Sequence, residues 1–173
     1  DQFDRLLDAL RAAGYRCVGP VVQDGAIQYR DLDSTAALPI GWQDTQTPAT
    51  YRLHRSDSPR QFAWANGPQA IKPHVFAAQE SLWRVRKAGQ GPLQFEAVMP
   101  DVPPIAIVGV RACDLAALAL QDAHFMREGR RDAQYMQRRE RLFLVAVQAP
   151  AGVDLLLRLV ELPCPQAAAK LLA

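Results

Sequence analysis

The chain has 173 residues, of which 49% are hydrophobic and 22% charged, a balance that fits one globular domain with an apolar core. Its formal net charge of +2 gives no field that would point to nucleic acid as a partner. Its longest strongly apolar run, residues 105–110, is far shorter than the ~20 residues that cross a bilayer, and its first residues lack the pattern of a secretion signal. We therefore expect a cytoplasmic protein without nucleic-acid or membrane partners.

The first thirty residues predict a helix followed by a β-hairpin. Apolar residues recur at helical spacing over residues 2–13, and Gly14 stands where a helix C-cap is expected. Residues 15–22 and 26–31 predict two strands joined by a tight turn. Pro20 places the first strand at a sheet edge or at a bulge, because proline has no N–H to donate to a neighbouring strand.

Residues 32–104 predict a loop-rich, mostly antiparallel region, because prolines interrupt every regular pattern in it. An irregular segment of this length often forms a binding surface. The elements expected here are short strands at 50–54, 60–65 and 93–98 and a short helix at 81–86. Two tryptophans are expected in the core and one at a pocket or interface, from the set Trp42, Trp64 and Trp83.

The last third predicts a parallel strand–helix–strand unit. The continuous apolar run at Ile105–Val110 indicates a strand covered on both faces, and residues 142–147 indicate a second such strand. A connection of this type is expected to be a right-handed crossover. The fold class is therefore α/β, or α+β, with a mixed sheet and an antiparallel, loop-rich first half. Helices are expected at 114–126, 132–141, 153–160 and 166–172.

The turn after Ile105–Val110 is the candidate functional site, because ligands gather where parallel strands end and helices begin. Gly109 allows close backbone approach, and Asp114 or Cys113 can cap the helix. The helix dipole and Arg111 would favour a Cys113 thiolate, which could bind a metal or act as a nucleophile. In the alternative interpretation, Cys113 is a packed residue, Asp114 is a cap and Arg111 pairs with a carboxylate.

The remaining chemistry-bearing residues form no motif. Cys17 is expected in the core, and together with Cys113 and Cys164 it cannot complete a shell of four thiolates. The arginines between residues 127 and 141 form a basic cluster that we expect to be a solvated helix face rather than a docking patch. No metal-ligand spacing links the three histidines, His54, His74 and His124.

Several segments, taken in order, resemble one known family. They are residues 6–15, 18–22, Leu38-Pro39-Ile40-Gly41-Trp42, 50–53, Asn66-Gly67-Pro68, Gly109-Val110-Arg111-Ala112-Cys113-Asp114-Leu115 and 142–147. This order resembles the amino-terminal domain of the iron–sulfur beta subunits of cytoplasmic sulfhydrogenases and NiFe hydrogenases. The corresponding iron–sulfur subunit of anaerobic sulfite reductase is a close relative of that family. The resemblance covers most of residues 3–147.

The resemblance implies a non-catalytic electron-transfer subunit of an oxidoreductase complex, carrying [4Fe-4S] clusters. Its partners would be a flavoprotein subunit that oxidises NAD(P)H and the hydrogenase or sulfite reductase subunits. Cys113 falls at the family's Arg-x-Cys-Asp position and would be a cluster ligand. Arg111 would favour the reduced, more negative cluster, and Asp114 would fix the helix start.

The chain departs from the family after Gln148, where the family has further cysteines and this sequence has none. Ala112 also stands where the family often has proline. We expect residues 1–148 to form the α/β amino-terminal domain and residues 149–173 to be a helical remnant after a missing loop. Two alternatives stay open, a cluster-free scaffold that docks partner subunits and a thiol enzyme with Cys113 as its nucleophile.

Overall fold

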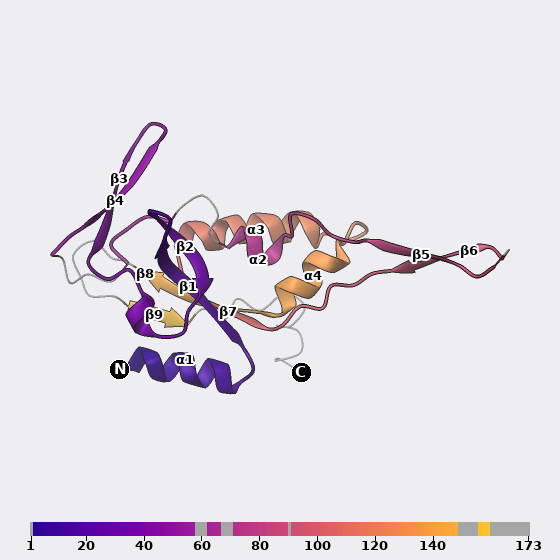
Figure 1. Cartoon of the computed structure of the whole chain (residues 1–173), viewed down its shortest axis with the longest axis horizontal. Helices are drawn as coiled ribbons and strands as arrows, with labels where there is room; N and C mark the ends of the chain where they lie inside the picture. Colours follow the sequence, from indigo (N-terminus) through magenta and orange to yellow (C-terminus); the bar gives the residue numbers. More distant parts are fainter. Residues whose placement is uncertain (1, 58–61, 67–70, 90, 149–155, 160–173) are drawn as a thin grey trace.

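The centre of the fold is a mixed sheet with the strand order β2-β1-β7-β8-β9 (Figure 1). The computed structural model describes residues 2–57, 62–66, 71–89, 91–148 and 156–159. β1 runs antiparallel to β2, whereas β1, β7 and β8 are parallel to one another, and β9 is antiparallel to β8. The predicted α/β class with a mixed sheet is confirmed. The strands are β1 (Arg16–Gln23), β2 (Ala26–Asp31), β7 (Ile105–Val110), β8 (Leu142–Gln148) and β9 (Leu156–Leu159).

Helices cover both faces of this sheet (Figure 1). On one face lies α1 (Gln2–Ala12), and on the other lie α2 (Lys72–Val75), α3 (Ala112–Phe125) and α4 (Ala133–Glu140). Every residue of β7 is buried, because its side chains alternate between the two layers. Ala106 packs on the α1 face, and Ile107 packs on the α3 face. In the part of the chain that the structure describes, no helix has the length and apolar character needed to cross a bilayer.

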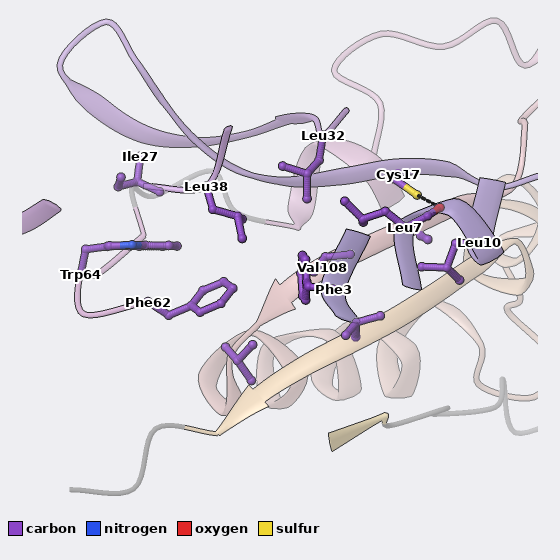
Figure 2. Close-up of a cluster of buried hydrophobic side chains, with 13 residues drawn as sticks. Phe3, Leu7, Leu10, Cys17, Ile27, Leu32, Leu38, Phe62, Trp64 and Val108 are labelled. Atoms are coloured by element: carbon purple, nitrogen blue, oxygen red, sulfur yellow. Dashed lines mark hydrogen bonds between the residues drawn. The ribbon is translucent and has the colours of Figure 1, made fainter. Parts of the chain in front are cut away.

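The core on the α1 face joins the amino-terminal helix to the sheet (Figure 2). Leu7 of α1 is fully buried there, and Cys17 of β1 is 5% exposed, as predicted for a core residue. The Cys17 thiol donates a weak hydrogen bond to the Leu7 carbonyl at 3.8 Å. Phe62 and Trp64 close one end of this core, so a segment remote in sequence from α1 supports the same layer.

Two hairpins, each a separate two-stranded sheet, project from this body (Figure 1). They are β3 (Trp42–Thr47) with β4 (Thr50–Arg55), and β5 (Trp83–Lys87) with β6 (Leu93–Ala97). A short 3₁₀ helix, η1 (Thr35–Ala37), lies between the central sheet and the first hairpin along the chain. The tryptophan prediction is wrong in number, because Trp64 is buried, whereas Trp42 lies half-buried under the Arg55 guanidinium and Trp83 is 62% exposed.

Three predicted elements are corrected by the structure. The helix expected at 81–86 is strand β5, since Trp83 and Val85 alternate with arginines at the two-residue period of a strand. The strand expected at 60–65 is not formed over residues 62–65, whose carbonyls at Phe62 and Trp64 accept hydrogen bonds from Arg111. The helix expected at 153–160 is strand β9 over residues 156–159, which extends the central sheet. The predicted helix at 166–172 and Cys164 lie outside the described residues.

Pro20 is not on an edge strand, because β1 lies between β2 and β7. The pairing of β1 with β7 nevertheless ends at Val18, two residues before the proline. The missing N–H of Pro20 therefore interrupts no ladder with β7. Asp24 and Gly25 both have positive φ, of 50° and 71°, which matches the predicted tight turn between β1 and β2.

Candidate functional site

The site begins at a bulge at the carboxyl end of β7. The register of β7 against β8 shifts between Val108 and Val110, and Gly109 between them has a φ of +85°. Val108 packs on the α1 face but Val110 packs on the α3 face, although residues two apart in a regular strand share a face. The bulge therefore rotates the end of β7 toward α3. A Cβ atom at Gly109 would lie only 2.7 Å from Cε1 of Phe62, so the close approach also requires glycine.

A chain of hydrogen bonds fixes the turn that follows the bulge. The Tyr29 hydroxyl donates to the Gly109 carbonyl at 2.7 Å, and Nδ2 of Asn66 donates to the Tyr29 oxygen at 3.4 Å. Nδ2 of Asn66 also donates to Oδ2 of Asp114 at 3.1 Å. Burial raises the pKa of Tyr29, and the negative charge of Asp114 acts in the same direction. The phenol therefore stays protonated and remains a hydrogen-bond donor at neutral pH.

The helix α3 begins at Ala112 with Arg111 as its N-cap, two residues before the predicted start at 114. Asp114 is the third helical residue, and its Oδ2 accepts a hydrogen bond from the backbone N–H of Arg111 at 3.1 Å. The carboxylate thus holds the helix start from inside the first turn instead of from the cap position. Cys113 is the second helical residue, in the first turn, where backbone N–H groups have no acceptor within the helix itself.

The side chain of Arg111 is directed at the segment that carries Phe62 and Trp64. Its Nη2 donates to the Phe62 carbonyl at 3.0 Å and also to the Trp64 carbonyl. Its guanidinium lies 4.9 Å from the centre of the Trp64 ring, within the range of a cation–π contact. Among the described residues, the hydrogen-bond acceptors of this side chain are carbonyls and not a carboxylate. Arg111 therefore ties the 62–66 segment to the β7–α3 turn.

An open cavity of about 440 Å³ lies beside this turn, and the exposed, free thiol of Cys113 is on its lining. The cavity is lined by the 65–66 segment, by residues at and just before α2, and by the β7–α3 turn and α3 as far as Gln121. Its apolar part comes from buried Ile71, Val75 and Leu118. Oδ1 of Asn66 is buried in the lining and has no hydrogen-bond partner within the described part of the chain. None of the described residues that line the cavity is a histidine, and the ionisable side chains beside Cys113 on the lining are those of Asp114, Arg111 and Lys72.

The described residues fit one thiolate ligand but not a complete four-thiolate cluster shell. Cys17 is buried in the α1-side core, whereas Cys113 lies on the α3 side of the sheet, so the two thiols do not converge. Within the described ranges, no three side chains of His, Cys, Asp or Glu are grouped as a metal site would require. The other three thiolates of a four-cysteine cluster at Cys113 would therefore have to come from outside these residues.

The sequence indicates Arg111, Cys113 and Asp114, and the structure places all three on the lining of one cavity. The sequence does not indicate Asn66 and Tyr29, which complete the hydrogen bonds of the turn. Asn66 belongs to a segment that carries the family resemblance, yet nothing local indicates its contact with Asp114, 48 residues away. Tyr29 gives no signal either, because a tyrosine in a strand is usually a core residue. Both become recognisable only once the strands are placed side by side.

No protein-family model, curated protein or solved structure matches this chain. The family resemblance, its cofactor and its partners therefore stay predictions.

Proposed function

We propose that this chain is a domain of an iron–sulfur electron-transfer subunit in a hydrogenase-type or sulfite-reductase-type complex, with Cys113 as a cluster ligand. The observation that carries the proposal is the position of Cys113. Its free thiol is exposed in the first turn of a helix that follows a parallel strand, beside a cavity of about 440 Å³. The helix dipole favours negative charge at that end, and deprotonated thiols are the usual ligands of iron–sulfur clusters.

In this proposal the chain supplies one thiolate, and thiols outside the described residues supply the others. A bound [4Fe-4S] cluster would provide one-electron transfer at this position. Asp114 keeps the first turn of α3 in place through the Arg111 backbone and Asn66, which holds the Cys113 thiol at the cavity. The positive charge of Arg111 would favour the more negative, reduced state. The proposed partners are a flavoprotein that oxidises NAD(P)H and hydrogenase or sulfite reductase subunits.

Iron content tests the proposal. The chain is purified anaerobically together with its copurifying subunits, and iron and acid-labile sulfide are measured per chain for wild type, Cys113→Ser and Cys17→Ala. We expect Cys113→Ser to lose iron and Cys17→Ala to keep it, because Cys17 is buried on the opposite face of the sheet. Iron that is unchanged in Cys113→Ser would remove Cys113 from the site.

A cluster-free scaffold that docks partner subunits is the second candidate. It is favoured by the internal engagement of Arg111 and Asp114, whose hydrogen bonds hold the turn together whether or not a cluster is bound. It also needs no thiolates beyond the single exposed thiol of the described residues. The same purification separates the two candidates, since a wild-type chain that binds its partner subunits and contains no iron supports the scaffold.

A further inference from the structure

The β5–β6 hairpin has two chemically different faces. Residues that pair directly across an antiparallel ribbon share one face, and neighbours along a strand alternate between faces. The first face is apolar except for one lysine, with the pairs Trp83–Ala97, Val85–Phe95 and Lys87–Leu93. The second face is polar, with the pairs Arg84–Glu96 and Arg86–Gln94. The hairpin therefore has the alternation of a strand pair that covers an apolar surface.

The apolar face nevertheless lies open. Trp83 is 62% exposed, Phe95 is 64% exposed and Leu93 is 54% exposed. Figure 1 shows the hairpin extending well beyond the helices and the central sheet, so it covers no part of the body. A two-stranded ribbon is only marginally stable alone in water, and a cluster of exposed large apolar side chains marks an interaction site. The apolar face of the hairpin is therefore a candidate binding surface.

Side chains of α4 hold the base of the hairpin. Nε2 of Gln134, a residue only 8% exposed, donates to the Val98 carbonyl at 2.8 Å and to the Ser81 carbonyl at 3.4 Å. The side-chain amide of Gln134 thus bonds to the chain on both sides of the hairpin, just before β5 and just after β6. Arg138 of α4 adds an ion pair with Glu80, next to the first leg. The hairpin is therefore presented as an arm in a fixed direction, which lowers the ordering cost of binding.

We propose that this arm inserts its apolar face, centred on Trp83 and Phe95, into an apolar groove of a partner protein whose rim carries carboxylates. The two strands carry three basic side chains, Arg84, Arg86 and Lys87, and one carboxylate, that of Glu96. This excess of positive charge suits an acidic rim and disfavours pairing with a second copy of the arm. The open ribbon edges can pair with a strand of a protein, whereas their unpaired backbone groups are costly in hydrocarbon. Tryptophan and arginine are typical anchors of protein interfaces.

This inference rests on the proposed function only in expecting a partner protein, and it is independent of any cluster. The tagged chain is used to capture proteins from extracts of its source cells. Each captured protein is identified, purified alone and titrated against wild type, Trp83→Ser/Phe95→Ser, Arg84→Glu/Arg86→Glu and the control Leu120→Ser. Leu120 is a matched control because it is 75% exposed on α3, away from the arm. Circular dichroism checks that each variant is folded.

For the true partner, the apolar double variant should raise the Kd roughly thirtyfold or more, and Leu120→Ser should leave it unchanged. The charge-reversal variant should weaken binding and make it less dependent on salt. The inference is overturned if no purified partner depends on Trp83 and Phe95. It is equally overturned if these two residues instead drive binding to phosphatidylcholine–phosphatidylserine vesicles or concentration-dependent dimerisation.

The two proposals fail separately. The Trp83→Ser/Phe95→Ser variant should keep whatever iron the wild type holds, because its substitutions lie on the projecting arm and not on the lining of the Cys113 cavity. Conversely, Cys113→Ser should bind the partner with wild-type affinity. An arm variant that loses iron but keeps its partner would contradict the docking role.

Discussion

Gly109 combines two separate requirements, a positive φ and a close approach to Phe62. Gly14, at the end of α1, has a similar φ of +87° but nothing within 4 Å of the position of a Cβ. We expect Gly14→Ala to lower the free energy of unfolding by about 1 kcal/mol, from backbone strain alone. Gly109→Ala should lower it by about 3 kcal/mol or more, because a steric clash is added to the strain.

Urea denaturation of both variants gives the comparison. The difference between the two losses gives the cost of the steric clash at Gly109 with Phe62 and, to a lesser extent, Pro20, since the backbone strain is nearly the same at the two positions. Equal losses would mean that Phe62 and Pro20 move aside at little cost and do not constrain the β7–α3 turn.

At the scale of elements, a buried ion pair joins α3 to α4. Nε of Arg139 lies 3.1 Å from Oδ2 of Asp122, with side chains 2% and 14% exposed, and the Tyr135 hydroxyl donates to Oδ1 of Asp122 at 2.7 Å. Asp122→Ala would leave the Arg139 charge buried without its carboxylate. We expect a loss of about 3–5 kcal/mol in the free energy of unfolding.

The exposed pair between Arg86 and Glu96 on the β5–β6 hairpin is the control for Asp122→Ala. Its side chains are 60% and 47% exposed, so Glu96→Ala should cost less than about 1 kcal/mol in the same thermal or urea unfolding experiment. If both variants cost the same, the α3–α4 pair has no special role in holding the two helices together.

Some strands and helices could be predicted from the sequence and others could not. β7 and β8 are recognisable because apolar runs buried on both faces are rare outside parallel strands. β3 gives no signal because its sequence, WQDTQT, lacks the apolar alternation of a half-buried strand. The helix prediction fails at β5 because five residues are too few to distinguish the 3.6-residue period of a helix from the two-residue period of a strand. The prediction of a solvated basic cluster is wrong at Arg138 and Arg139, whose side chains are only 12% and 2% exposed and pair with Glu80 and Asp122 outside α4.

At the scale of the molecule, the site depends on contacts that no local pattern contains. Arg111 reaches Trp64 across 47 residues, and Tyr29 reaches Gly109 across 80 residues. The β7–α3 turn can be located from the sequence because strand ends and helix starts leave local signals. The opposing 62–66 segment cannot, because its backbone groups bond to residues remote in sequence, namely Arg111, Asp44 and Tyr51.

Both helical layers share β7, so the two faces of the sheet should unfold as one unit. Leu7→Ala removes a fully buried side chain from the α1 face and should cost about 2–5 kcal/mol. Hydrogen exchange should then show amides of β7 and α3 losing protection by the same free energy, although Leu7 packs on the opposite face from α3. Leu120→Ala, the same change at a 75% exposed position, should stay within about 0.5 kcal/mol of wild type. Loss of protection confined to α1 would show instead that the α3 layer and the Cys113 site stand independently of the amino-terminal helix.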